Sequence, residues 1–229
     1  TSELAVGGED STMAFGKREL TPHPLAKLIK ASNKLLRLTP SIDSLVQSRL
    51  AYKFAISEEK GFMSGNGAQQ PLGLFTASAN GISTGRDVSS GNSTTEIAPD
   101  GLINALYSLK GAYMNRAEWL FHRDAVKQIR KLKDGNGQYI WSPGLSGQPS
   151  MILDKPYSMS EYVPNTFTTG LYVGLVGDLS FYWIADALGM TVQRLVELYA
   201  ATNQTGFIGR LETDGMPVLE EAFARVKLA

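Results

Sequence analysis

The clearest periodic pattern of apolar and polar positions lies between residues 41 and 63. Apolar side chains recur there every three or four positions, which predicts an amphipathic helix. Thr39 or Ser41 can cap its start, and Pro40 suits a first helical position. At 1.5 Å per residue this helix is about 34 Å long, enough to brace a whole subunit. Its apolar positions are Ile42, Leu45, Val46, Leu50, Tyr52, Phe54 and Ile56.

Shorter patterns predict the other elements. Residues 1–20 contain few large apolar side chains and predict an exposed, extended arm, whereas the Gly, Ser, Thr and Asn content of residues 65–100 predicts loops with short strands. A helix is predicted after Pro99, with Leu102, Ile103, Leu106, Leu109 and Tyr113 on one face, and another over 123–132. Strands are predicted at 23–31, 119–122, 139–141, 151–153, 171–176, 181–184, 191–198 and 218–228.

Two segments fit either secondary structure. Residues 32–36 suit a strand or a short helix, and residues 219–224 suit a helix as well as the preferred strand. The elements do not alternate regularly as strand, helix and strand, so the pattern indicates the α+β class.

Composition excludes several kinds of site. The 229 residues include no Cys, which removes thiol nucleophiles, disulfides and cysteine-bound metals, and only two His, at positions 23 and 122. The 22 basic and 22 acidic residues balance, which argues against a dedicated nucleic-acid binder and does not oppose self-association. With 43% hydrophobic residues the chain can bury a core, and no apolar run reaches the roughly 20 residues of a membrane span.

The first residue is Thr1, and no charged segment followed by an apolar one comes after it. We therefore expect no signal peptide, and we expect the chain to be a fragment or a processed product.

Two glycine-containing loops were considered as binding sites. Residues 65–73 do not fit a dinucleotide loop, because a helix precedes them and Pro71 opposes a helix start. Residues 134–138 resemble the start of a calcium loop, but Tyr139 and Leu145 stand where Gly and Glu are needed. Both segments are predicted to be structural turns.

A Ser-His-Asp triad can be composed on paper around His122. The sequence contains no G-x-S-x-G nucleophile motif, and His122 ends an apolar strand beside Arg123 and Asp124. A hydrogen-bonded structural histidine is favoured over a catalytic base. His23 lies between two prolines and is predicted to be exposed in an extended segment.

The adjacent acidic pairs, at residues 58–59 and 220–221, point successive side chains in different directions and are not placed for shared acid–base work. Asp178 and Asp186 flank an aromatic stretch that could line a pocket, but they are predicted to accept hydrogen bonds from backbone amides.

Several segments, in a fixed order from about residue 20 to the C-terminus, resemble the major capsid proteins of tailed bacteriophages, which have the Hong Kong 97 type fold. The central part of the resemblance is the junction of the long helix with the glycine-rich loop. The segments are QSRLAY at 47–52, EEKGFMSGNG at 58–67, PLGL at 71–74, LKDGNGQYIW at 132–141, VGDLS at 176–180, IAD at 184–186 and MTV at 190–192.

The resemblance implies a particular anatomy. Residues 1–20 correspond to a remnant of the extended loop that reaches over a neighbouring subunit. Residues 21–96 and 191–229 correspond to the peripheral domain, with the spine helix at 41–63, and residues 97–190 to the axial domain. Curvature of a shell then calls for flexible hinges, expected at residues 65–67 and 80–91.

The resemblance also implies a function. The chain is expected to be no enzyme, with no catalytic, cofactor or metal site, and to assemble with itself as pentamers and hexamers of an icosahedral shell around phage DNA. Portal, scaffolding and decoration proteins are further expected partners, and no membrane is. The expected location is the virion capsid, and the host bacterial cytoplasm during assembly. Weak DNA contact can come from Lys127, Arg130, Lys131 and Lys133, for which a solvated helix face is the simpler explanation.

Two alternatives remain at this point, an encapsulin-type nanocompartment shell of the same fold and a hydrolase built on His122. Some family members join subunits through a Lys–Asn isopeptide bond. Lys17 lies in the arm, but residues 210–229 contain no Asn, so this cross-link is not expected.

Overall fold

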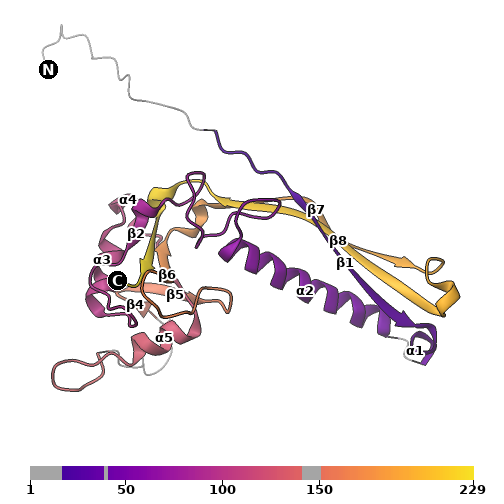
Figure 1. Cartoon of the computed structure of the whole chain (residues 1–229), viewed down its shortest axis with the longest axis horizontal. Coiled ribbons are helices and arrows are strands. Elements are labelled where there is room, and N and C mark those ends of the chain that lie inside the picture. Colours follow the sequence, from indigo (N-terminus) through magenta and orange to yellow (C-terminus); the bar gives the residue numbers. More distant parts are fainter. Residues whose placement is uncertain (1–16, 39–40, 141–150) are drawn as a thin grey trace, which may run out of the picture.

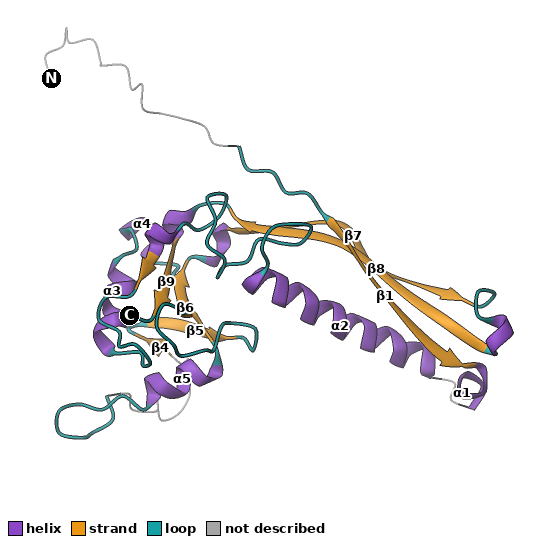
Figure 2. Cartoon of the chain, in the orientation of Figure 1, coloured by secondary structure: helices purple, strands orange, loops and turns teal. Residues whose placement is uncertain are grey.

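The computed structural model describes residues 17–38, 41–140 and 151–229, which form two lobes (Figure 1). One lobe is elongated, with a long helix lying along a narrow sheet. The other is rounder, with short helices around a second sheet (Figure 2). Among the described residues, no helix is both long enough and apolar enough to cross a membrane.

The elongated lobe contains a three-stranded antiparallel sheet in the order β1-β8-β7. Helix α2 lies along it, and the short helix α1 follows β1 at the far end of the lobe (Figure 1). The elements are β1 (His23–Ser32), α1 (Asn33–Leu38), α2 (Ile42–Ser64), β7 (Tyr182–Leu195) and β8 (Gln204–Pro217).

The core of this lobe lies between α2 and β8. Leu50 and Phe54 of α2 pack with Phe207 and Leu211 of β8 in one buried cluster. A Cβ on Gly209 would lie 2.5 Å from the Phe54 ring, so only glycine lets the helix approach this closely. Burial of this apolar stripe holds the helix to the sheet.

The round lobe contains a six-stranded sheet in the order β2-β9-β6-β3-β5-β4. Its strands are β2 (Asp87–Val88), β3 (Glu118–Phe121), β4 (Met151–Ile152), β5 (Lys155–Met159), β6 (Tyr172–Gly177) and β9 (Phe223–Lys227). Its helices are α3 (Pro99–Tyr107), α4 (Gly111–Met114) and α5 (Arg123–Arg130). Short 3-10 turns occupy Thr84–Arg86, Leu179–Phe181, Ala200–Thr202 and Glu220–Ala222.

Two fully buried aromatic residues on β3 form the centre of the round lobe. The rings of Trp119 and Phe121 are stacked with centroids 5.4 Å apart, and the Trp119 indole N–H donates to the Ile152 carbonyl at 2.9 Å. Phe121 also packs directly against the backbone of Gly174 on β6, where a Cβ would overlap its ring.

We therefore expect Gly174→Ala to lower the free energy of unfolding by about 1–3 kcal/mol, because a methyl group there overpacks the core. Urea denaturation followed by tryptophan fluorescence measures this. Gly135→Ala is the matched control, since no atom lies within 4 Å of a Cβ built at that position. Equal stability of the two variants would contradict this packing.

The structure confirms the main predicted elements. These are the strand at 23–31, the long helix, the helix beginning at Pro99, the buried strand at 119–122 and the helix at 123–132. The ambiguous segment after residue 32 is helical.

The start of α2 and its buried face differ from the prediction. Ser41 precedes α2 without a side-chain capping hydrogen bond, and Thr39 and Pro40 lie outside the described residues, as does most of the predicted arm. Leu45 and Tyr52, assigned to the buried stripe of α2, are exposed.

The predicted strand at 139–141 is wrong. Tyr139 forms only an isolated bridge with Lys133, Ile140 is exposed, and Trp141 lies outside the described residues. Two strands were missed, β5 and the 14-residue β8, and the strands predicted at 181–184 and 191–198 are one continuous strand, β7. Residues 218–228 contain a 3-10 turn followed by β9.

The two sheets differ from the expected domain division at three points. The expected boundary at residue 190 lies inside β7, which pairs with β8 along the elongated lobe. Strands β2 and β9 were expected in the peripheral part, yet both belong to the six-stranded sheet of the round lobe, where β9 pairs with β6. The C-terminus therefore returns to the round lobe, as Figure 1 shows.

Candidate functional site

The glycine-rich loop after α2 folds back and caps the helix. The N–H groups of Leu74 and Phe75 donate to the carbonyls of Phe62 and Met63, each at 2.9 Å, which satisfies carbonyls that a helix end leaves free. A Cβ on Gly73 would lie 2.6 Å from the backbone of Met63. The structural turn predicted at 65–73 is confirmed, and its glycines permit close backbone approach. The hinge at 65–67 stays a prediction.

His122 is buried and occupied at both ring nitrogens. Its Nδ1 accepts the N–H of Asp124 at 3.1 Å and so caps α5, while Nε2 lies 3.3 Å from a Glu161 carboxylate oxygen. The same Nδ1 lies 3.3 Å from an Asp124 carboxylate oxygen, so a carboxylate approaches each ring nitrogen. Within the described parts of the chain, no Ser or Thr hydroxyl is bonded to this ring. The geometry favours the structural role.

The acidic pairs do not act together, as predicted. Glu59 accepts the Ser160 hydroxyl at 2.6 Å, whereas its neighbour Glu58 faces a groove described below. Glu221 pairs with Lys110, while Ser83 donates to Glu220 and lowers the pKa of that carboxyl. Each carboxylate meets a different partner.

The single aspartates also have local partners. Asp178 accepts the N–H of Ser180, as predicted, but Asp186 accepts the side-chain hydroxyl of Thr213 at 2.7 Å, so the backbone-amide prediction is wrong there. Asp134 accepts the N–H groups of Asn136 and Gln138, which confirms a turn after α5. Residues 17–38, 41–140 and 151–229 contain no group of three His, Asp or Glu that could hold a metal ion.

The basic residues considered for DNA contact, at positions 127, 130, 131 and 133, divide into two kinds. Arg130 donates to the Tyr157 hydroxyl at 2.8 Å, and Lys133 lies 5.0 Å from the centroid of the Tyr139 ring. Lys127 of α5 and Lys131, which directly follows the helix, are exposed. Lys17, considered for a cross-link, forms an exposed ion pair with Glu19.

A buried ion pair that the sequence did not reveal joins the 80–91 loop to β9. The guanidinium of Arg225 has no exposed surface and contacts the Asp87 carboxylate at 2.6 Å, with a further hydrogen bond to the Ser83 carbonyl at 2.8 Å. The Tyr172 hydroxyl donates to the same carboxylate, and the Arg225 guanidinium lies 4.6 Å from the centroid of the Tyr172 ring. Burial raises the pKa of Tyr172, so the phenol stays a donor.

Arg86 adds a second attachment of this loop. Its guanidinium donates to the carbonyls of Phe223 and Ser108, at 3.0 and 3.2 Å. The 80–91 segment is therefore fixed to the round lobe at Ser83, Arg86 and Asp87, whereas a hinge needs a segment that is free to move. Its predicted flexibility has no support in these contacts.

The far end of the elongated lobe carries exposed apolar side chains in two segments, which follow the two outer strands β1 and β7 of the sheet. One segment is α1 and the other is the turn between β7 and β8, and they are tied together by Asn33, whose N–H donates to the Asn203 carbonyl at 3.1 Å. We call this group the tip patch. It consists of Leu35, Leu38, Val196 and Leu198, which are 47, 71, 54 and 68% exposed.

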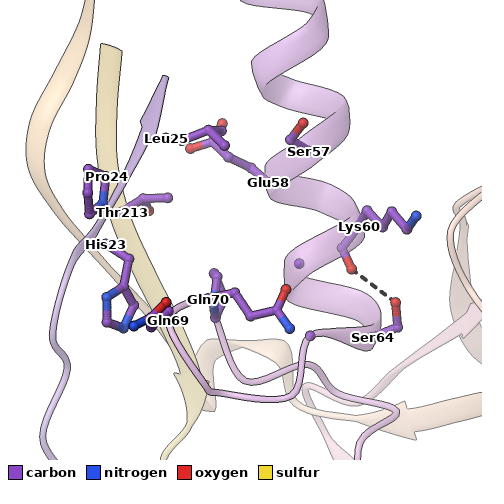
Figure 3. Close-up of a pocket in the computed structure, with 13 residues that line it drawn as sticks. His23, Pro24, Leu25, Ser57, Glu58, Lys60, Ser64, Gln69, Gln70 and Thr213 are labelled. Carbon is purple, nitrogen blue, oxygen red and sulfur yellow. Dashed lines mark hydrogen bonds between the residues drawn. The ribbon is translucent and has the colours of Figure 1, made fainter. Parts of the chain in front are cut away.

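A groove of about 370 Å³ lies between the C-terminal half of α2, the first residues of β1 and the glycine-rich loop (Figure 3). Polar side chains from all three surround it, together with Thr213 of β8. His23, expected to be exposed, is one of its lining residues and is partly buried.

A sequence model described as the phage capsid family matches residues 1–228. The chain belongs to this family. Its curated relatives include the major capsid protein of Enterobacteria phage HK97, which is 27% identical over 170 residues. That match covers 70% of this capsid-family chain and 41% of the relative, so the chain spans less than half of that protein.

Solved structures confirm the fold of this capsid-family chain. The capsid of an empty GTA particle, computed with C5 symmetry, has a TM-score of 0.81 at 24% sequence identity. The match covers 98% of this chain and 81% of the GTA capsid chain. The capsid of the native GTA particle has a TM-score of 0.82. The holo-SrpI encapsulin complex from Synechococcus elongatus is more distant, with a TM-score of 0.61 at 14% identity over 90% of this chain and 73% of its own. The expected Hong Kong 97 type fold is therefore confirmed.

Proposed function

We propose that this chain is the major capsid subunit of a phage-type shell, and that it works by self-assembly and not by catalysis. The tip patch carries this proposal. Four large apolar side chains are exposed at the end of a long lobe, where burial in a contact with another protein would be favourable. In a chain of the phage capsid family, that other protein is a further copy of itself.

The lobes suit this role. The elongated lobe is rigid, because α2 packs along β8 in one hydrophobic core and the glycine-rich loop caps the C-terminal end of the helix. We assign the elongated lobe to the peripheral domain and the round lobe to the axial domain, which surrounds the five-fold and six-fold centres of the shell. Contacts around such centres are head to tail, so they need two different surfaces on each copy.

The proposed contents of the shell are phage DNA, held by weak and non-specific contacts of exposed lysines such as Lys127 and Lys131. Portal, scaffolding and decoration proteins complete the proposed partners, and the virion and the host cytoplasm are the proposed locations. The encapsulin alternative has some support, since one encapsulin shares the fold, but its TM-score is lower than those of the GTA capsids.

Sedimentation velocity of the purified full-length protein tests the proposal. We expect a fast species of tens to hundreds of copies that grows with protein concentration, and a protein that stays monomeric over a wide range of salt and concentration contradicts it. The contents of particles from the natural source separate the two kinds of shell. Nuclease-protected DNA supports the phage-type capsid, and a co-purifying enzyme supports the encapsulin.

A further inference from the structure

The groove at the end of α2 contains a carboxylate without a counter-ion. Glu58 reaches from α2 toward the strand that carries Leu25, whereas Lys60 of the same helix extends away from the strands (Figure 3). In the part of the chain that the structure describes, the Glu58 carboxylate accepts no hydrogen bond and forms no ion pair.

A second carboxylate acts on Glu58 electrostatically. Asp186 of β7 is hydrogen-bonded to Thr213, which itself lines the groove. Partial burial and the charge of Asp186 together raise the pKa of Glu58. The other titratable groups of the groove are His23 on β1 and the outward-pointing Lys60, and neither is bonded to Glu58.

The chemistry of the lining favours an ammonium group as the missing partner. Side-chain oxygen acceptors are available from two elements, Ser57 and Glu58 of α2 and Gln69 of the glycine-rich loop. An ammonium is a compact charge with three donors that can meet separate acceptors, whereas a guanidinium prefers one carboxylate in a planar, two-bond contact.

The chain itself supplies suitable lysines. Lys34, Lys53, Lys127 and Lys131 are exposed, and their ammonium groups have no hydrogen-bond or ion-pair partner among the residues described. These exposed ammonium groups and the unpaired carboxylate of Glu58 have opposite charges, so two different surfaces of the chain can complement each other. Such complementarity between two different surfaces is what a head-to-tail contact uses.

We infer that this groove receives a lysine side chain of a second copy of this chain, which pairs with Glu58 in the assembled shell. The inference rests on the proposed function and names one contact within it. It predicts two opposite effects of the Glu58 carboxylate. This group slightly destabilises the isolated subunit and stabilises the contact between subunits.

Carbodiimide cross-linking of mixed shells tests the contact. Shells are assembled from equal amounts of ¹⁵N-labelled and unlabelled full-length protein, treated with the zero-length reagent, and digested for mass spectrometry. We expect the Glu58 peptide joined to a lysine peptide of the other isotope. A link only within one chain, for example to Lys27 on β1, or no link at Glu58 while other carboxylates react, overturns the inference.

Glu58→Gln gives the second test, with Glu96→Gln as the control because Glu96 is exposed in a loop and its carboxylate has no described partner. We expect Glu58→Gln to leave the Tm of the isolated subunit unchanged or raise it by up to about 2 °C, while raising the protein concentration needed for assembly about tenfold. Assembly of Glu58→Gln at the concentration of the control contradicts the inference and leaves the proposed function intact. Failure of the unmodified protein to assemble contradicts both.

Discussion

Replacing Arg225 by Met is expected to lower the free energy of unfolding by about 3–5 kcal/mol, because it leaves a buried carboxylate without its cation. The Asp87 side chain is only 7% exposed, and Arg225 is its closest charged partner, whereas Lys227 lies 3.9 Å away. The substitution also removes the bond to the Ser83 carbonyl. Chemical denaturation of the isolated subunit, followed by circular dichroism, gives the measurement.

Arg210→Met on β8 is the matched control, since Arg210 is exposed and no ion pair is found for it in the described chain. Its effect should stay within about 0.5 kcal/mol. The double variant Arg225→Met with Asp87→Asn should recover part of the loss, because no buried charge then remains unpaired. An Arg225→Met protein as stable as the control would show that the ion pair does not hold the 80–91 loop.

The double substitution of Leu38 and Leu198 by Ser is expected to abolish shell assembly while leaving the isolated subunit folded. Both side chains are about 70% exposed, at 71 and 68%, so their loss costs the subunit little. In a contact, each leucine contributes about 1.5–3 kcal/mol when it is fully buried. Because every copy loses both side chains at every contact, the assembled fraction should fall at least tenfold.

Substitution of the same two leucines by Met provides the control, since Met preserves the apolar character and nearly the volume of the patch. The Met variant should assemble like the unmodified protein. Light scattering during assembly compares the three proteins, and thermal unfolding confirms that each is folded. Normal assembly of the Ser variant would show that the tip patch is not a contact between subunits.

The long helix and the core of the round lobe could be predicted because local patterns encode them. The spacing from Ile42 to Phe54 marks a helix whatever its partners are, and Trp119 to His122 marks a buried strand. The predicted buried face of this helix was too wide, since Leu45 and Tyr52 are exposed. Periodicity identifies an apolar side chain but not whether its own chain or another copy covers it.

Strand β8 could not be recognised from its sequence. Its glycines at 206, 209 and 215 are typical of loops, yet in the structure they make room for Tyr199, Phe54 and Tyr182. For Gly209 the requirement comes from Phe54, which lies far away in the sequence. The same holds for the pair of Asp87 and Arg225, which are 138 positions apart and meet only because β2 lies parallel to β9.

The groove and the tip patch could not be predicted from the sequence for the same reason. The sequence pairs Glu58 only with its neighbour Glu59, because it shows which residues are adjacent along the chain and not which residues meet across the sheet. Asp186 approaches it through the pairing of β7 with β8, and β8 was the strand that the pattern missed. The resemblance to phage capsid proteins identified the fold, whereas the groove and the tip patch became visible only in the three-dimensional structure.

Electron microscopy of the purified full-length protein tests the shell proposal most directly. We expect closed icosahedral particles, or rings of five and six subunits, in which the elongated lobes of neighbouring rings meet at their tips. A field of separate monomers across the range of salt and protein concentration would contradict the assignment of this chain as a capsid subunit.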